Sequence, residues 1–471
     1  MKILSDINEN KKILKSRIPI DQSFDVIGRE IKVGNKDCYL VFIDGFAKDD
    51  IMLWILETLQ SMETVGNINF IKKLLSRKIG YIEVETFDDF ETLEDSVLSG
   101  AVALILDKEN EGLIIDAREY PVRGPEEPDL EKVTRGSRDG LVETIVFNTA
   151  LIRRRIRDTN LVFEMKSVGK RSKTDVVVGY IKDLADNKLV DDIKQKLDSV
   201  DVDSLIMAEK TLDELIIKKK WYNPLPQVKF TERPDVVSAH LLEGHVAIIV
   251  DTSPSVMLLP ATLFHFTQHA EDYYQNPLVG TYLRWVRFFG ILLSFVLLPL
   301  WLLLVYNKSI LPESLSFLGP KETGVIPLFL QFIILELGID LLRIASIHTP
   351  NSLSTSLGIV GGLILSEFAI KVGWFVPETV LYMAIVSLGT FATPSIEFSM
   401  AIRIFRLFLL ICTGLFKLYG FIVALSIVGI IIFKTKSFNN KSYLWPLIPL
   451  DIKSLSNVLF RKPIPEIKKH K

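Results

Sequence analysis

The 471-residue chain has few cysteines and little net charge, and both shortages exclude classes of protein. Cys38 and Cys412 are its only cysteines, so it cannot build a disulfide framework or a cysteine-ligated zinc site. Its 55 Lys and Arg residues against 57 Asp and Glu residues leave a formal charge of −2. A nucleic-acid-binding protein that relies on bulk positive charge is therefore excluded, and we expect no nucleic-acid partner.

Motifs of common enzyme classes are also missing from the sequence. It contains no Walker loop, no dinucleotide fingerprint, no GxSxG and no HExxH. His265 and His269 stand four residues apart, with His240 and His245 upstream. A metal site would need a carboxylate or third histidine nearby, so we interpret the pair as a surface or interface pair. We expect no enzyme activity, no metal and no cofactor.

An apolar leader is missing from Met1 to Ile18, which is rich in Lys, Asn and Asp. Since a signal peptide needs an apolar core, we expect the N-terminal part to stay in the cytoplasm. The mean hydropathy of +0.29 is nevertheless high for a chain that is 24% charged. Residues 1–287 carry a net charge of −9, whereas residues 288–471 carry +7. These values predict an acidic soluble module followed by a membrane domain.

Two pairs of similar segments indicate that the soluble module is duplicated. Leu40–Leu59 and Val178–Leu197 each combine an apolar strand, a polar turn and an amphipathic helix, at an offset of 138. Gly100–Ala117 and Gly244–Ala261 each pair a strand ending in Asp with a second apolar strand, at an offset of 144. We therefore predict an α/β cytoplasmic module of two tandem similar subdomains, followed by an α-helical multi-pass membrane domain.

The expected domain boundaries follow from these patterns. They are an N-terminal tail (1–19), a first α/β subdomain (20–120), a connector with a helix (121–159), a second α/β subdomain (160–280), a membrane domain of four to six helical segments (281–433) and a basic cytoplasmic tail (434–471). The connector ends in a basic run at Arg153, Arg154, Arg155 and Arg157. We interpret this run as a solvated helix face or as salt bridges between subunits, rather than as a phosphate site.

Phe288–Tyr306 is the clearest candidate span, with 19 uncharged residues after Arg284 and Arg287. Pro299 should kink this helix without breaking it. Four further apolar segments are Gly324–Ile347, Ser352–Ile370, Thr379–Ile396 and Leu407–Phe433.

The segment Leu407–Phe433 is interrupted only by Lys417, so it is either one long tilted helix or a hairpin. The basic tail argues for a cytoplasmic C-terminus and an even number of crossings, which favours the hairpin. Four preceding spans would place Arg403 and Arg406 in the cytoplasm.

Three charged residues within the second apolar segment are candidate functional residues. Glu336, Asp340 and Arg343 are separated by four and three positions, so they share one helical face that should avoid lipid. One interpretation is a polar pathway for ions. The other is an Asp340–Arg343 bridge, with Glu336 paired to a neighbouring helix.

A stripe of small residues recurs at every fourth position in the third segment, at Ser354, Gly358, Gly362 and Ser366. Such a stripe usually allows helices to pack closely. In an oligomer it could instead line a narrow pore.

Long, unusual strings give the chain a family resemblance from about Phe24 to about Phe433. They are PVRGPEEPD (121–129), RGSRDGLVETIVFNTALIRRRIRD (135–158), TERPDVVSAHLLEGHV (231–246), TYLRWVRF (281–288), GPKETG (319–324) and FATPSIEF (391–398). With these strings the chain resembles the A-subunit family of bacterial spore germinant receptors. The connector around Glu126–Gly136 and the GPKETG string are similar to one branch of that family.

This resemblance implies a multi-pass protein of the dormant spore's inner membrane, with two similarly folded cytoplasmic subdomains. Relatives form oligomeric channels that release monovalent cations early in germination, beside a transporter-like B subunit and a lipoprotein C subunit. The branch is associated with the dipicolinate-channel operon and implies a small integral membrane partner. We therefore expect a homo-oligomer, and the resemblance carries over no catalytic residue.

The resemblance and the charge pattern together suggest a pore. As a hypothesis, Glu336 and Asp340 supply the negative field that favours cations. Two other functions stay open: a non-conducting scaffold or sensor that recruits germination partners, and a small secondary transporter. A transporter would predict an inverted repeat among the spans, and the sequence shows none.

Overall fold

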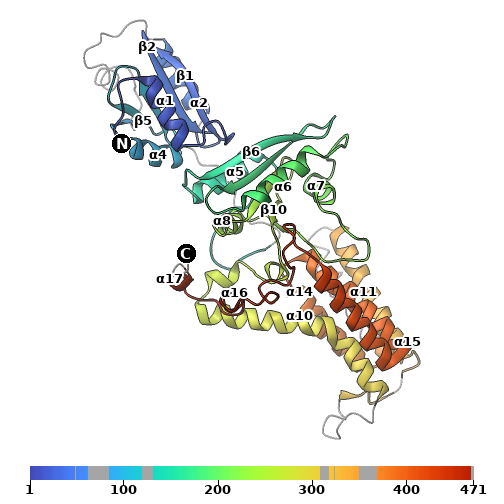
Figure 1. Cartoon of the computed structure of the whole chain (residues 1–471). Coiled ribbons are helices and arrows are strands. Elements are labelled where there is room, and N and C mark those ends of the chain that lie inside the picture. Colours follow the sequence, from blue (N-terminus) through green and yellow to red (C-terminus); the bar gives the residue numbers. More distant parts are fainter. Residues whose placement is uncertain are drawn as a thin grey trace. The chain divides into compact units, whose positions relative to one another are not determined.

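The computed structural model describes residues 1–47, 49–61, 84–118, 131–307, 318–322, 324–348 and 369–467. These residues form two compact units, Met1–Lys219 with Val228–Pro260 and Lys220–Gln227 with Ala261–Lys471. The first unit combines two antiparallel sheets with helices, and the second is built mainly of helices (Figure 1).

The first sheet has five strands in the order β1-β2-β4-β5-β3, and all neighbouring strands are antiparallel. The strands are β1 (Val26–Val33), β2 (Lys36–Ile43), β3 (Val84–Phe87), β4 (Val102–Leu106) and β5 (Gly112–Ile115). Helices α1 (Ile7–Arg17) and α4 (Phe90–Leu98) pack on one face, and α2 (Asp49–Gln60) packs on the other. Because both faces are covered, every residue of β4 is apolar and buried.

The second sheet has the order β6-β7-β9-β10-β8, which is the first order repeated with strands matched along the chain. Its strands are β6 (Leu161–Val168), β7 (Thr174–Ile181), β8 (Lys229–Thr231), β9 (Val246–Val250) and β10 (Val256–Leu259). The helices around it are α5 (Ile145–Arg155), α6 (Asn187–Asp198), α7 (Ala208–Ile216) and α8 (Pro234–Leu242). The common strand order agrees with the predicted duplication.

Matching hydrogen bonds extend the duplication to single side chains. Asn10 in α1 and Asn148 in α5 are fully buried, and each exchanges two hydrogen bonds with the backbone six positions earlier. Asp107 and Asp251 follow β4 and β9, and each accepts a bond from the first amide of α1 or α5 (N···O 3.4 and 3.3 Å). Helices α1 and α5 are therefore parts of the two repeats, although they lie in the segments expected as tail and connector.

The two subdomains also exchange contacts. Ala150 of α5 packs in the core of the first subdomain, and Phe24 packs against the core of the second. Arg153 donates from Nε to Asp25 Oδ2 (2.6 Å) and from Nη2 to Ser23 Oγ (3.2 Å). Arg153 is fully buried, so the interpretation of the basic run as a solvated face is wrong for this residue.

Four helices form the main body of the second unit. They are α10 (Pro277–Tyr306), α11 (Leu328–His348), α14 (Pro377–Phe391) and α15 (Ile396–Lys434). By length and composition, α10 and α15 are apolar enough to cross a membrane. Helix α10 continues unbroken past Pro299, and its Gly290 lies directly against Gly389 of α14. A Cβ on Gly389 would collide with the carbonyl oxygen of Gly290, so a side chain at position 389 would push these two helices apart.

Helix α15 is a hairpin of two helical arms rather than one straight helix. Lys417 has φ 55° and ψ −131°, which breaks the helical geometry at this residue. A Cβ built on Gly420 would collide with the carbonyl oxygen of Cys412, eight residues earlier. In a straight helix these residues would be about 12 Å apart, so the chain turns back at Lys417, as the favoured interpretation predicted.

The segment after α15 is packed rather than free. Tyr443 is fully buried in the cluster that holds Phe266 and residues of both arms of α15, and its hydroxyl donates to the carbonyl of Pro226 (2.8 Å). Helix α16 (Ile452–Leu459) then packs beside α10. The short elements η1 (Leu263–Phe266), α9 (Glu271–Tyr274), α13 (Ala369–Lys371) and α17 (Ile464–Ile467) complete the second unit as described.

Candidate functional site

A buried ion-pair cluster joins α11 to the first arm of α15. Glu336 of α11 is fully buried, and Arg403 and Arg406 of α15 are 3% and 1% exposed. Arg403 donates from Nε to Glu336 Oε2 (3.1 Å), and Arg406 donates to both carboxylate oxygens (2.5 and 3.0 Å). One carboxylate therefore receives three charge-assisted hydrogen bonds from two guanidinium groups.

Arg406 extends the cluster to two further helices. Its Nη1 donates to the carbonyl of Ser294 in α10 (2.6 Å) and to Thr390 Oγ1 in α14 (3.4 Å). Arg403 in turn donates to the backbone carbonyl of Glu336 (2.7 Å). The planar guanidinium groups thus hold four helices at fixed spacing, which a lysine could not do.

Asp340 and Arg343 lie one and two turns further along α11. Asp340 Oδ1 is 2.5 Å from Nη1 of Arg403, and the Asp340 side chain is 31% exposed. Arg343 Nη1 lies 2.7 Å from the sulfur of Met400. Glu336 thus pairs with a neighbouring helix, as one interpretation predicted, but Asp340 pairs with Arg403 rather than with Arg343.

The five ionisable groups carry three positive and two negative charges. Because Glu336 is paired with two cations, its charge is offset and it adds little negative field for a passing ion. A small cavity of about 10 Å³, room for about one water, lies beside the cluster. Its lining includes Arg343, Ser387, Thr390, Arg403 and Arg406.

Arg403 and Arg406 are the functional candidates that sequence analysis missed. Both lie buried inside the helical bundle, and their expected position on the cytoplasmic side of the membrane remains a prediction. Their spacing of three places both on one face of a helix, the same signal that singled out Glu336, Asp340 and Arg343.

The stripe of small residues at Ser354, Gly358, Gly362 and Ser366 lies outside the described residues. Its role as a close contact or as a pore lining remains a prediction.

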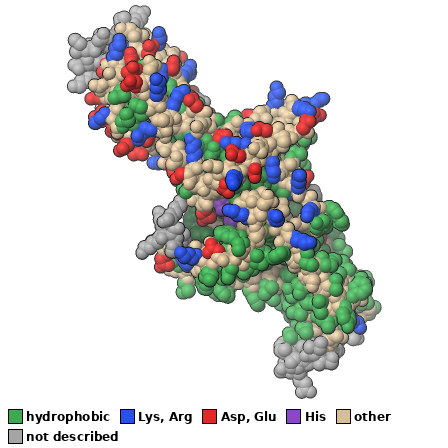
Figure 2. All heavy atoms as spheres, in the orientation of Figure 1, with side chains coloured by type: hydrophobic (Ala, Val, Ile, Leu, Met, Phe, Trp, Pro, Cys, Tyr) green, Lys and Arg blue, Asp and Glu red, His purple; other side chains and the backbone are tan. Residues whose placement is uncertain are grey.

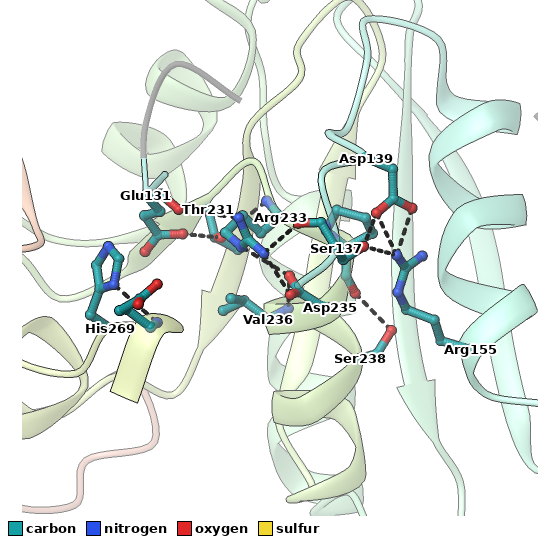
Figure 3. Close-up of polar contacts among 12 residues, drawn as sticks. Glu131, Ser137, Asp139, Arg155, Thr231, Arg233, Asp235, Val236, Ser238 and His269 are labelled. Carbon is teal, nitrogen blue, oxygen red and sulfur yellow. Dashed lines mark hydrogen bonds and ion pairs between the residues drawn. The ribbon is translucent and has the colours of Figure 1, made fainter. Parts of the chain in front are cut away.

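A second polar network ties the connector to the second subdomain (Figure 3). Arg233, fully buried, pairs with Asp235 (2.7 Å) and donates to the carbonyl of Ser137 (3.0 Å). Arg155 of α5 pairs with Asp139 (2.5 Å). Burial is the largest single influence on the pKa of the Asp139 carboxyl, and it raises that pKa. Hydrogen bonds from Arg155 and Ser137, together with the Arg155 charge, outweigh burial and hold the pKa below its usual range. The strings RGSRDG (135–140) and TERPD (231–235) therefore contact each other, and these contacts hold the connector against the second subdomain.

Four of the histidines contact residues close to them in the sequence. His265 Nδ1 contacts Thr262 Oγ1 (2.9 Å) at the start of η1, and His269 Nδ1 accepts from a backbone amide two residues later (3.1 Å). The rings of His240 and His245 lie edge to face, 5.1 Å apart. Across the parts of the chain that the structure describes, no group of three or more His, Cys, Asp or Glu residues could hold a metal ion.

Comparison with known proteins gives the family. Residues 12–471 match the family described as Bacillus/Clostridium GerA spore germination protein. The chain is 44% identical to stage V sporulation protein AF of Bacillus subtilis (strain 168), over 98% of this chain and 93% of that protein. It is 31% identical to spore germination protein GerLA of Bacillus cereus, over 90% of this chain and 87% of that protein.

Among solved structures, the N-terminal domain of the A subunit of the Bacillus megaterium spore germinant receptor GerK3 is 26% identical, with a TM-score of 0.42. That match covers 55% of this chain and 96% of the solved domain. The branch expected from the connector and the GPKETG string is that of stage V sporulation protein AF, and the 44% match agrees with it. The family match, which spans nearly the whole sequence, means that the chain belongs to the GerA family of spore germination membrane proteins.

Proposed function

We propose that this protein is the pore-forming subunit of a homo-oligomeric ion channel that releases monovalent cations from germinating spores. The observation that carries the proposal is the set of ionisable side chains held inside an otherwise apolar helical bundle, centred on Glu336. Such residues are costly within a membrane, and they commonly mark an ion pathway. In this proposal the protein is a multi-pass protein of the spore inner membrane, with its N-terminal unit in the cytoplasm.

The roles within the cluster differ. Glu336 pairs with Arg403 and Arg406 and positions α11 against α15, and Arg403 links this buried set to Asp340. Asp340 is the carboxylate with partial exposure, so it is the group through which α11 would present negative charge to a cation. Arg343 would add positive charge to the same face of α11 and so oppose the effect of Asp340.

Ion flux from liposomes that contain the full-length protein tests this assignment. We expect Asp340→Asn to lower the preference for K⁺ over Cl⁻, because the variant removes a charge but keeps the size of the side chain. Glu397→Gln, at an exposed site in the first turn of α15, is the matched control. Unchanged selectivity in Asp340→Asn would remove Asp340 from the pathway.

The small-residue stripe supplies a second element of the proposal. Ser354, Gly358, Gly362 and Ser366 would form the constriction or a tight helix contact, since small side chains leave room for water or for a close neighbour. Gly358→Leu should then lower conductance and slow germination. If both were unaltered, the stripe would be neither pore nor contact.

A non-conducting scaffold is the second candidate function. It is favoured by the small size of the cavity beside the cluster, about 10 Å³, which is too small to hold a hydrated ion. The soluble subdomains would then recruit partners, including a small integral membrane protein. Purified protein that gives no ion leak in any oligomeric state would favour the scaffold over the channel.

A further inference from the structure

The first half of α10 exposes an apolar stripe on one side. The stripe comprises Leu278, Val279, Tyr282, Trp285, Val286 and Phe289, at spacings of one, three and four. Leu278 is 79% exposed, Tyr282 66% and Phe289 61%. These spacings place all six side chains on one face of the helix.

The opposite face of this half-helix is held by buried charges. Arg284 and Arg287 both pair with Asp272 of α9, which is fully buried (3.3 and 2.8 Å). Arg284 also donates to the carbonyl of Asn457 in α16 (2.8 Å). Because these bonds fix the rotation of α10, the apolar stripe cannot turn inward.

Helix α16 and its flanks, which pack beside α10, also expose apolar side chains. Leu450 is 64% exposed, Ile452 73% and Phe460 46%, and the Phe460 ring lies 6.0 Å from that of Trp285. Figure 2 shows hydrophobic side chains gathered along the α10 and α16 part of the second unit.

We propose that this surface, which we call the interfacial platform (Leu278, Tyr282, Trp285, Phe289, Ile452 and Phe460), lies on the lipid headgroup region of the membrane. Its Trp and Tyr side chains have an apolar body and a polar tip, the composition found where a bilayer meets water. The stripe runs without a break into the uncharged segment Phe288–Tyr306 of the same helix, which is a candidate span as a whole, so the platform lies at the N-terminal end of that segment. A lipid surface is therefore its occupant, in the manner of an amphipathic helix that lies in the interface plane.

Basic residues beside the platform suit anionic headgroups. Lys453 is exposed next to Ile452, and Arg461 and Lys462 follow Phe460. Cations near a membrane surface attract anionic lipid and add to the burial of apolar area. The C-terminal segment would thus rest on the bilayer, whether or not the protein conducts ions.

Spin labels on the full-length protein in liposomes test the platform. Single cysteines would be placed by Tyr282→Cys and Ile452→Cys in a Cys38→Ala, Cys412→Ala background, with Lys453→Cys as the matched control beside Ile452. Power saturation then compares collisions of each label with O₂, which dissolves in lipid, and with a water-soluble nickel chelate. Leu278→Cys supplies another stripe position if Tyr282→Cys does not fold.

We expect O₂ to relax the platform labels more strongly than the nickel chelate, and the reverse order at position 453. Platform labels that the chelate reaches freely would place the surface in water and overturn the proposal. Labels shielded from both reagents would show a protein contact, such as a second copy of the chain, and would overturn it as well.

Discussion

Glu336 shows how a charged side chain can be kept inside an apolar bundle. Its carboxylate has no solvent exposure, and it accepts hydrogen bonds from Arg403 and Arg406. Removing one member of such a set leaves the others buried and unpaired, which costs more than the pair contributes. The stability of the bundle should therefore depend strongly on this one residue.

Glu336→Gln should lower the free energy of unfolding by about 3 kcal/mol, because the buried Arg406 loses its counter-ion and Arg403 keeps only Asp340. Thermal unfolding of the protein in detergent would measure the loss. Glu397→Gln, at an exposed position in α15, should change stability by about 0.5 kcal/mol or less. Equal effects of the two substitutions would contradict a structural role for the cluster.

Arg153 plays the corresponding part in the first unit, where it pairs with Asp25 across the two subdomains. Arg153→Lys should destabilise this unit by about 2 kcal/mol, because a single ammonium cannot keep both the Asp25 and Ser23 contacts. Hydrogen exchange of the full-length protein would localise the loss. Arg154→Lys, at the exposed neighbouring position, should behave as wild type.

His245 should give the first unit a pH-dependent stability. Burial lowers its pKa to about 4, from an ordinary value of 6.5, because the charged imidazole is poorly solvated there. Below pH 6.5 the unfolded chain binds a proton that the folded chain excludes until about pH 4, so stability falls as the pH drops through this window.

The expected loss in stability from this histidine is on the order of 1–3 kcal/mol. Thermal unfolding at pH 7.5 and pH 5.0 would measure it, with His245→Gln as the variant that cannot titrate. The drop in melting temperature between the two pH values should be smaller in His245→Gln. An equal drop in both proteins would show that other groups carry the pH dependence.

At the scale of elements, the turn inside α15 is the feature with the clearest sequence signal. Lys417 is the single charge in a long apolar run, and the chain reverses at that residue. Its φ of 55° and ψ of −131° match the first central position of a type II′ turn, where glycine is preferred.

Lys417→Gly should therefore stabilise the hairpin by about 1 kcal/mol, because glycine adopts this backbone geometry without a Cβ clash. Lys417→Val should destabilise it, since a β-branched side chain is disfavoured at positive φ. Thermal unfolding in detergent would rank the three proteins. If Lys417→Gly were no more stable than wild type, the positive φ at this position would not limit the stability of the hairpin.

The repeats and the hairpin could be predicted because their signals are local. Two pairs of similar segments in the same order predicted the same arrangement twice, and the strands that end before Asp107 and Asp251 are equivalent. The ion pairs could not be predicted, because Glu336 and Arg403 are 67 residues apart, and Arg153 and Asp25 are 128 apart. Hydrophobic periodicity indicates which face is buried, but not which distant charge lies opposite.

At the scale of the whole molecule, the helical unit exposes many large apolar side chains. Leu341 is 67% exposed, Leu388 70% and Tyr419 81%, on three different helices. A membrane domain presents such side chains to lipid or to another subunit. We expect some of them to form the contacts of a homo-oligomer.

Electron microscopy of the detergent-purified protein should show a closed ring of identical subunits. A pore on the ring axis would form between chains. The size of the small cavity beside the Glu336 cluster would then not limit the passage of a hydrated ion. Native mass spectrometry would give the number of subunits. A protein that stays monomeric in several detergents would contradict the ring and support the scaffold.

Each repeat contributes a side chain to the core of the other, and this exchange limits how the module could have changed in evolution. Ala150 completes the core of the first repeat, and Phe24 packs on that of the second, so neither half has a complete interior of its own. Recombination that replaced a single repeat would leave a hole on one side and a clash on the other. The two halves are therefore expected to have been inherited together after the duplication, changing by compensating substitutions rather than by shuffling.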